Sequence, residues 1–213
     1  RIHSPSGIPV LIGDNQEVRT WSVCRKLFDE GVVGGAKQAG ADIWLSSKPV
    51  SAEEIDDHVL LSIASPNGEV SVRCKLLCGA DGAHSWVGRR FKMGRPKELM
   101  IGFQVEVTGY KGEQGRLDMY TGSGYSPGFF AWAIPSGETT RIGTWSRPEL
   151  MGGGSCEQLL DRLRAEPLWS ERFSECREVG RFCGPIPSGL VKRPMRGRVV
   201  LFGDAAGLCK PTT

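Results

Sequence analysis

The sequence lacks the features that mark a membrane span, a disulfide framework or a structural metal site. No stretch approaches the roughly 18 consecutive apolar residues of a transmembrane helix. Only three histidines are present, all far apart, and the seven cysteines, an odd number, include no CxxC pair. This cysteine usage suits a reducing cytoplasm, and the scarcity of histidine predicts that no metal is bound.

A strong charge of either sign is also missing. Lys and Arg number 27 against 24 Asp and Glu, a net charge of +3, and no basic run interleaves with aromatic residues. We therefore expect no nucleic-acid partner. The first residues, "RIHSPSGIPV", hold neither an apolar core nor an initiating Met, so we expect neither a signal peptide nor a natural start. A chain that is 39% hydrophobic and 24% charged is typical of a soluble globular protein with a real core.

The pattern of elements predicts an α/β fold, α+β over the whole length. A short strand at 19–23 precedes a helix at 25–40, which Gly34-Gly35 weakens. Further strands are expected at 41–46 and 76–80, and a hairpin of 58–65 with 69–75 turns at Asn67-Gly68. Residues 199–203 form one more buried strand, and a helix begins at Ala205.

Between Glu98 and Thr144 the pattern changes to short strands separated by Gly and Pro. We expect these strands to form an antiparallel sheet, at 99–107, 116–120, 128–135 and 139–145. A flexible break at Met151–Ser155 then leads into an amphipathic helix that Pro167 ends. The sequence therefore predicts a nucleotide-type α/β domain, 1–97 and 186–213, interrupted by a β-rich domain at 98–185.

Asp204 is the first candidate site residue. It follows the apolar run Val199–Phe202, which is typical of a strand buried on both faces. Ligands of open α/β folds bind beyond the carboxyl ends of such strands, where a carboxylate can accept hydrogen bonds from sugar hydroxyls. The backbone N–H groups of a helix starting at Ala205 would face the same place. Asp is also a favoured helix cap, so the pattern alone leaves both roles open.

Two further segments have the same ambiguity. Asp81 and Gly82 follow a second buried strand, but Asp-Gly is also common in simple turns, and Ser85 is expected to cap a short helix. Arg25 lies at the start of the long helix, where a guanidinium can neutralise a diphosphate or merely face solvent.

Taken together, "VCRKLFD", "GADGAHSWVGRR" and "GDAAGLCKP" resemble, in order and separation, the FAD-binding domain of the flavoprotein hydroxylase-like superfamily. The resemblance implies that FAD is the cofactor and that Asp204, in "GDAA" with Gly203 and Ala205, binds its ribityl chain. It further implies that Arg25, Asp81 and Gly82 lie along the diphosphate and that Pro211 abuts the flavin ring. The N-terminal βαβ unit of that domain, and helices after Thr213, are expected to be missing from this chain.

Within that superfamily the sequence is most similar to the geranylgeranyl reductase family. "PGFFAWAIPSGETTRIG" resembles that family's substrate motif, Tyr-x-Trp-x-Phe-Pro followed by Gly-x-Gly, with Phe130, Trp132, Ile134 and Pro135 in the aligned places. Phe130 replaces the tyrosine, Ile134 the phenylalanine and Trp145 the second glycine, and these departures bear on the shape of the cavity. Alternation along the strand predicts Phe130 and Trp132 on one face and Phe129 on the other, and core packing is the alternative role for this strand.

The resemblance implies an FAD-dependent reductase of carbon–carbon double bonds in a geranylgeranyl or other isoprenoid lipid. Its partners would be that substrate and an electron donor such as NAD(P)H or ferredoxin, and a cytoplasmic enzyme acting on lipid would contact a membrane peripherally. No residue is identified as the catalytic proton donor. An FAD-dependent monooxygenase or halogenase of aromatic substrates, and a non-catalytic flavin electron-transfer module, are the alternatives.

Overall fold

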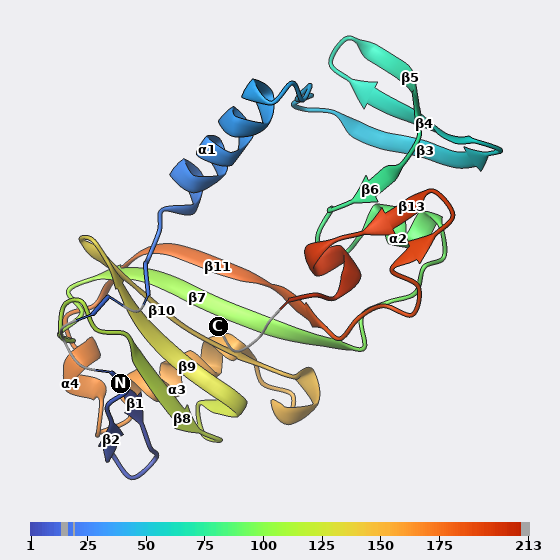
Figure 1. Ribbon diagram of the computed structural model, residues 1–213. Coiled ribbons are helices and arrows are strands. Elements are labelled where there is room, and N and C mark those ends of the chain that lie inside the picture. The colour runs from blue at the N-terminus through green and yellow to red at the C-terminus, as the bar shows by residue number, and fades with distance from the viewer. Residues whose placement is uncertain (14–16, 19, 210–213) are drawn as a thin grey trace. The chain divides into compact units, whose positions relative to one another are not determined.

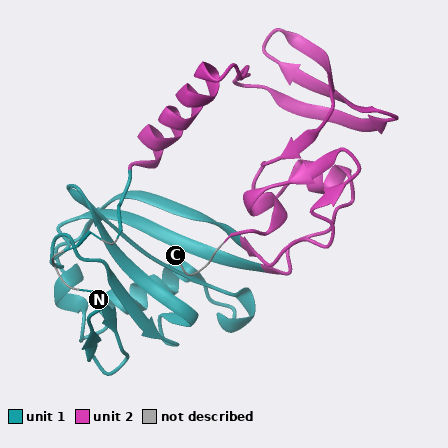
Figure 2. Cartoon of the chain, in the orientation of Figure 1, with its two compact units in different colours: residues 1–23, 99–186 teal, residues 24–98, 187–213 magenta. Residues whose placement is uncertain are grey.

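The computed structural model describes residues 1–13, 17–18 and 20–209 of the chain (Figure 1). These residues form two compact units, each made of two stretches of sequence (Figure 2). Unit 1 comprises residues 1–23 and 99–186, and unit 2 comprises residues 24–98 and 187–213. Each unit has its own hydrophobic core. The assignment of one domain to FAD and the other to substrate stays a prediction.

Unit 1 is built on a seven-stranded sheet with the order β11-β7-β10-β9-β8-β1-β2. The strands are β1 (Ile2–His3), β2 (Pro9–Val10), β7 (Glu98–Thr108), β8 (Asp118–Gly122), β9 (Ser126–Ser136), β10 (Thr139–Ser146) and β11 (Arg177–Ser188). The pairs β7–β10, β10–β9 and β9–β8 are antiparallel, which confirms the antiparallel sheet, whereas β1 adds to β8 in parallel.

One face of this sheet packs against α3 (Cys156–Ala165) and α4 (Ser170–Phe173), which follow a short 3-10 turn, η1 (Pro148–Leu150). Leu159, Leu160 and Leu163 of α3 are buried, and they contribute to one core with Val105 and Ile142 of the sheet. The helix begins as the sequence predicts, because Ser155 and Gln158 form a reciprocal capping box at its start.

Unit 2 contains an antiparallel sheet of β3 (Lys48–Ile55), β4 (His58–Ser65) and β5 (Gly68–Cys74). The hairpin of β4 and β5 confirms the predicted one, with Gly68 at a φ of 111° in the turn. The strands predicted at 19–23 and 41–46 are wrong for every described residue of those ranges. The strand in this part of the chain is β3 instead. It is a strand because its backbone pairs with β4, from Lys48 opposite Ala64 to Ile55 opposite His58.

A second small sheet in unit 2 has the order β12-β13-β6, with β12 (Met195–Arg196), β13 (Val199–Leu201) and β6 (Leu77–Gly79). α2 (Trp86–Arg90) packs on it so closely that a Cβ on Gly79 would come 2.7 Å from Leu201 Cδ2 and 2.9 Å from Val87 Cβ. This packing fixes the loop between β6 and α2.

The helix expected from Ala205 is wrong within the described residues. Gly203–Ala206 form only a single 3-10 turn, η2, which ends at Gly207 in the left-handed conformation (φ 74°). Gly207 lies against the carbonyl of Gly189, so a side chain could not fit there. A turn this short has too few aligned peptide dipoles to attract a negative charge. The helix N-terminus predicted at Ala205 is therefore wrong for the described residues.

The long helix α1 (Arg25–Gln38) confirms the prediction for 25–40, but none of its residues is buried. Leu27, Phe28 and Val32 are 66%, 55% and 58% exposed. Among the described residues no helix combines the length and the apolar composition needed to cross a membrane.

Candidate functional site

The carboxyl ends of β6 and β13 lie side by side in unit 2. The two strands are parallel neighbours, with Val199 opposite Leu77 and Leu201 opposite Gly79. The N–H of Phe202 donates to the carbonyl of Gly79 at 2.8 Å, which continues the pairing past the last residue of β13. Parallel strands end at the same sheet edge, so the segments Asp81-Gly82 and Gly203-Asp204 emerge together. The structure thus brings together two segments that are far apart in sequence.

Asp81 organises the loop that follows β6. One of its carboxylate oxygens, Oδ2, accepts hydrogen bonds from the N–H groups of Trp86 at 2.7 Å and Val87 at 3.0 Å. Ser85 Oγ accepts from the N–H of Gly88 at 2.8 Å, as the sequence predicts for the cap of α2. The Asp81 carboxylate is therefore engaged by the protein backbone, and its predicted role beside a diphosphate stays a prediction.

The residues at this edge fit a ligand that carries hydroxyl groups. Gly82 (φ 79°) and Gly203 (φ 53°) are left-handed, and the space where a Cβ would lie is open at both. Asp204 is exposed, and its carboxylate accepts no hydrogen bond from the η2 backbone, so the capping role is not observed. Ala205 is buried in the core of unit 2. A chain of hydroxyl groups such as ribityl needs a backbone that it can approach closely and a hydrogen-bond acceptor that the protein does not already engage.

Arg25, another residue predicted to contact the cofactor, makes no hydrogen bond or ion pair with the described residues of this edge. Arg25 is on α1, where its side chain is 72% exposed and pairs with Asp29 one turn along the helix, at 3.1 Å. Pro211 lies outside the described residues. Their predicted roles stay predictions.

The predicted substrate strand is β9 of unit 1, and its two faces differ. Ala131 and Ala133 are fully buried in the core under α3, whereas Phe130, Trp132 and Ile134 are half-buried on the opposite face. The bulky apolar residues of β9 therefore do not form the core of unit 1, which disfavours the core-packing alternative. Alternation places Pro135 on the side of the alanines.

Two residues missed by the sequence reasoning hold Trp132 in place. The indole Nε1–H donates to Gln104 Oε1 on β7 at 3.1 Å. Gly143 of β10 is paired directly with Trp132, and a Cβ there would overlap the indole ring. Gly143 stands at the first glycine of the Gly-x-Gly motif, so this motif could have identified it from the sequence. The strand register explains why a glycine is needed there, because it places Gly143 directly opposite Trp132.

Phe129 does not lie where alternation predicts. Its ring stacks on Phe130 with the centroids 4.1 Å apart, and it meets Trp145 edge-on at 4.0 Å. Trp145 is two residues from Gly143 on β10 and shares its face. The prediction of opposite faces for Phe129 and Phe130 is therefore wrong. The physical reason is Gly128, whose φ of 78° breaks the pleat just before Phe129.

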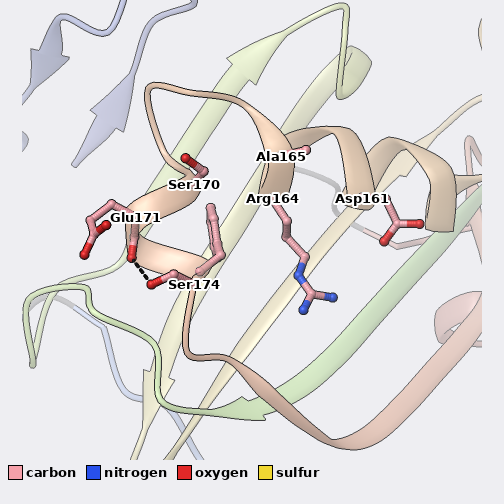
Figure 3. A pocket seen from close by; sticks show the side chains of 7 residues that line it. Asp161, Arg164, Ala165, Ser170, Glu171 and Ser174 are labelled. Carbon is pink, nitrogen blue, oxygen red and sulfur yellow. Dashed lines mark hydrogen bonds between the residues drawn. The ribbon is translucent and has the colours of Figure 1, made fainter.

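A separate hollow of about 450 Å³ lies between α3 and α4 (Figure 3). Arg164 and Asp161 of α3, Ser170 and Glu171 of α4, and Ser174 just after α4 line it. Ser174 Oγ donates to the carbonyl of Glu171 at 2.9 Å. No predicted site residue lines this hollow.

Comparison of the sequence with known proteins finds relatives over the whole chain. Digeranylgeranylglycerophospholipid reductase of Methanocaldococcus jannaschii is 24% identical, and the match covers 100% of this chain and 54% of that protein. Digeranylgeranylglycerophospholipid reductase 2 of Methanothermobacter thermautotrophicus is 27% identical with the same coverage. The chain thus spans about half the length of these relatives. No protein-family model matches it.

Solved structures share the fold. A geranylgeranyl bacteriochlorophyll reductase-like protein from Thermoplasma acidophilum superposes with a TM-score of 0.85 at 24% identity, over 100% of this chain and 55% of that one. A flavoprotein/dehydrogenase from Cytophaga hutchinsonii gives 0.74 at 19% identity, over 91% and 50%. A flavin-dependent brominase gives 0.76 at 18% identity, over 96% and 55%. The chain therefore has a mixed α/β fold that is also found in flavin-dependent enzymes, and its sequence is similar to proteins named digeranylgeranylglycerophospholipid reductase.

Proposed function

We propose that this chain is part of an FAD-dependent reductase that adds hydrogen across carbon–carbon double bonds of a geranylgeranyl-bearing lipid. The observation that carries the proposal is the paired strand edge of unit 2, where Asp204, Gly203 and Gly82 offer a free carboxylate and two open glycines. The similarity over the whole chain to proteins named digeranylgeranylglycerophospholipid reductase supports the choice of substrate.

At the strand edge we assign the ribityl hydroxyls to Asp204 and the approach of the diphosphate to Gly82, with Arg25 as a further contact. A reduced flavin held at this edge would supply the hydride for reduction of an alkene, and the second hydrogen would be added as a proton. The chain itself contributes a carboxylate acceptor and glycines that let the ligand approach the backbone closely. A charged acceptor matters because it forms stronger hydrogen bonds than a neutral one.

The half-buried face of β9 supports an apolar substrate. Phe129, Phe130, Trp132 and Ile134 present rings and a branched chain, and the indole N–H of Trp132 is already engaged by Gln104. An isolated alkene carries no activating group, so it must be held in a dry site in the reactive orientation. A phenol substrate would need polar side chains to orient it, and β9 places none among these rings.

The proposal includes two partners. A reductive reaction needs an external electron donor, either NAD(P)H or a protein such as ferredoxin, and a lipid substrate requires peripheral access to a membrane. The compartment that we propose is the cytoplasm.

The test is product analysis with the full-length protein. Flavin-loaded protein is reduced with dithionite under anaerobic conditions, incubated with detergent-solubilised digeranylgeranylglycerophospholipid, and the lipid is analysed by mass spectrometry. We expect a gain of hydrogen pairs. Incorporation of oxygen or halogen into an aromatic substrate, with no change in the lipid, would overturn the proposal in favour of a monooxygenase or halogenase.

A variant on β9 sharpens the test. Trp132→Ala is expected to lower lipid turnover at least tenfold while flavin content stays unchanged. Trp44→Ala is the matched control, because Trp44 is 49% exposed and belongs to unit 2. Equal turnover by Trp132→Ala and the parent would show that the face of β9 does not contact the lipid.

A further inference from the structure

We infer that a basic surface of unit 2, made of residues 88–98 and 190–198, binds the anionic surface of a lipid membrane. This inference rests on the proposed function, since it names the surface through which a lipid-reducing enzyme would reach its substrate. These two segments hold nine of the chain's 27 Lys and Arg residues but one of its 24 Asp and Glu residues. The rest of the chain is therefore net negative, and the positive charge is concentrated here.

The two segments are held side by side by backbone contacts. The N–H of Arg193 donates to the carbonyl of Met93 at 3.1 Å, and the N–H of Lys97 donates to the carbonyl of Gly189 at 3.2 Å. Met93 itself is fully buried in the core of unit 2. The fold thus gathers two basic runs that are about a hundred residues apart into one fixed surface, where they would otherwise repel each other.

Four of the arginines on this surface are engaged by the fold. Each donates a side-chain N–H to a backbone carbonyl: Arg89 to His84, Arg90 to Ala52, Arg196 to Phe91 and Arg198 to Lys75. These hydrogen bonds give the four arginines a structural role. They join the two segments to the residues on either side of α2, to β3 and to the residue after β5.

The other five cations have no such role. Lys92, Arg95, Lys97, Lys192 and Arg193 are all exposed. Within the described part of the chain, none of these five side chains forms an ion pair or a hydrogen bond. Glu98 lies within these segments and Glu54 accepts a hydrogen bond from the N–H of Arg198 at 2.7 Å, but the cations outnumber these carboxylates. The excess of like charges is repulsive, so the arrangement favours an external anionic partner.

Exposed apolar side chains on the same segments favour a membrane over an acidic protein or a nucleic acid. Leu190 is 44% exposed and Met195 is 65% exposed, and they flank Lys192 and Arg193 in the sequence. Basic residues interspersed with apolar ones that can enter the headgroup region are typical of peripheral membrane surfaces. Each Lys or Arg near an anionic leaflet adds about 1 kcal/mol of attraction.

The test is vesicle binding by the full-length protein without substrate. Cosedimentation is measured with vesicles of phosphatidylcholine alone and with vesicles that contain phosphatidylglycerol. We expect binding only to the anionic vesicles, and we expect it to weaken as salt rises because exposed charges are screened. The quadruple variant Lys92→Gln, Arg95→Gln, Lys192→Gln and Arg193→Gln should bind at least about tenfold more weakly.

The matched control removes four other exposed lysines of unit 2: Lys26→Gln, Lys37→Gln, Lys48→Gln and Lys75→Gln. It has the same change in net charge and should keep most of the vesicle binding. Circular dichroism and the melting temperature establish that both variants are folded. Activity on detergent-solubilised lipid should be equal in parent and variants, so loss of the membrane surface is distinguishable from failure of the proposed reaction.

Two results would overturn the inference. One is equal vesicle binding by the basic-surface variant and the parent. If that variant also lost turnover supported by an acidic protein electron donor, or lost binding to DNA, the surface would be assigned to that partner instead. The other result is loss of bound flavin in the variant, which would assign the cations to the cofactor phosphates.

Discussion

At the scale of single residues, the absence of a side chain at Gly143 makes room for the indole ring of Trp132. Gly143 faces Trp132 across β9 and β10, and the indole occupies the space where a Cβ would lie. We expect Gly143→Ala to force the indole out of position and to lower the free energy of unfolding by about 1–3 kcal/mol. The matched control is Gly184→Ala on β11, where the space for a Cβ is open.

Thermal unfolding of the two glycine variants measures the difference. Fluorescence of the tryptophans provides a second readout, since displacement of Trp132 breaks its hydrogen bond to Gln104. A melting temperature for Gly143→Ala equal to that of Gly184→Ala would mean that the strands separate enough to accept the methyl group at no cost.

Asp204 carries the prediction for the cofactor edge. In the full-length protein, Asp204→Ala should weaken flavin binding, and Asp204→Asn should retain part of it by keeping an acceptor oxygen. Each hydrogen bond lost to a charged acceptor is worth about 1.5–3 kcal/mol. Flavin fluorescence titration measures the affinity, with Asp42→Ala, another exposed aspartate of unit 2, as the control. Parent-like affinity in both Asp204 variants would contradict the assignment.

At the scale of elements, a buried polar cluster ties β1 to β8 and α4. His3 Nε2 lies 2.8 Å from Asp118 Oδ1, and both residues are buried. Tyr110 donates to the other carboxylate oxygen at 3.0 Å, and Arg172 lies 3.3 Å from it. The His3 ring also stacks on Tyr120, with the centroids 4.8 Å apart. The cluster adds side-chain contacts to the backbone pairing of the short strand β1 with β8.

This cluster predicts a dependence of stability on pH. Burial lowers the pKa of His3 below its ordinary value of about 6.5, and the nearby Asp118 only partly opposes that effect. The unfolded chain therefore binds the proton more readily than the native state does. The contribution of neutral His3 is fully present above pH 6.5 and is lost as the pH falls toward the lowered pKa.

The measurement compares melting temperatures at pH 8 and pH 5.5 for the parent and His3→Gln. The parent should lose more stability over this range than the variant. His84→Gln, which removes an exposed histidine, should behave like the parent. If His3→Gln and the parent lose the same stability, the titration of other groups accounts for the dependence.

Local signals in the sequence predicted several elements correctly. The β4–β5 hairpin follows from alternation and a left-handed turn at Gly68, and α2 follows from the cap at Ser85, both of which are local effects. β3 could not be predicted in the same way. "KPVSAEEI" contains Pro49 and two adjacent glutamates, which disfavour a strand locally, and only pairing with β4 makes it one.

The residues of the candidate sites could be predicted from the sequence, but their positions relative to one another could not. The segments around Asp81 and Asp204 were found from their motifs, but their contact depends on the parallel pairing of β6 with β13. The 3-10 turn at Gly203–Ala206 was missed even though Gly207 is a typical helix-ending residue. The position of Phe129 depends on the backbone conformation of Gly128, which the strand pattern did not reveal.

At the scale of the whole molecule, the described chain should not hold FAD by itself. Asp81, Gly203 and Asp204 are all exposed at their sheet edge, whereas binding sites usually bury about 70–90% of a ligand's surface. Purified residues 1–213 should therefore show no flavin absorbance in the visible spectrum, and the full-length protein should be yellow. Stoichiometric flavin in purified residues 1–213 would contradict the assigned edge.

The parallel pairing of β6 and β13 also governs the order in which the protein can fold during synthesis. Arg198 donates to the carbonyl of Lys75 at a sequence separation of 123 residues, and most of the intervening chain, residues 99–186, belongs to unit 1. At about 5–20 residues per second, β6 leaves the ribosome on the order of ten seconds before its partner strand exists. During that interval its edge is unpaired and open to wrong partners. Strands β7 to β10 of unit 1 are synthesised within that interval, so the edge that carries Asp81 and Asp204 forms only after them.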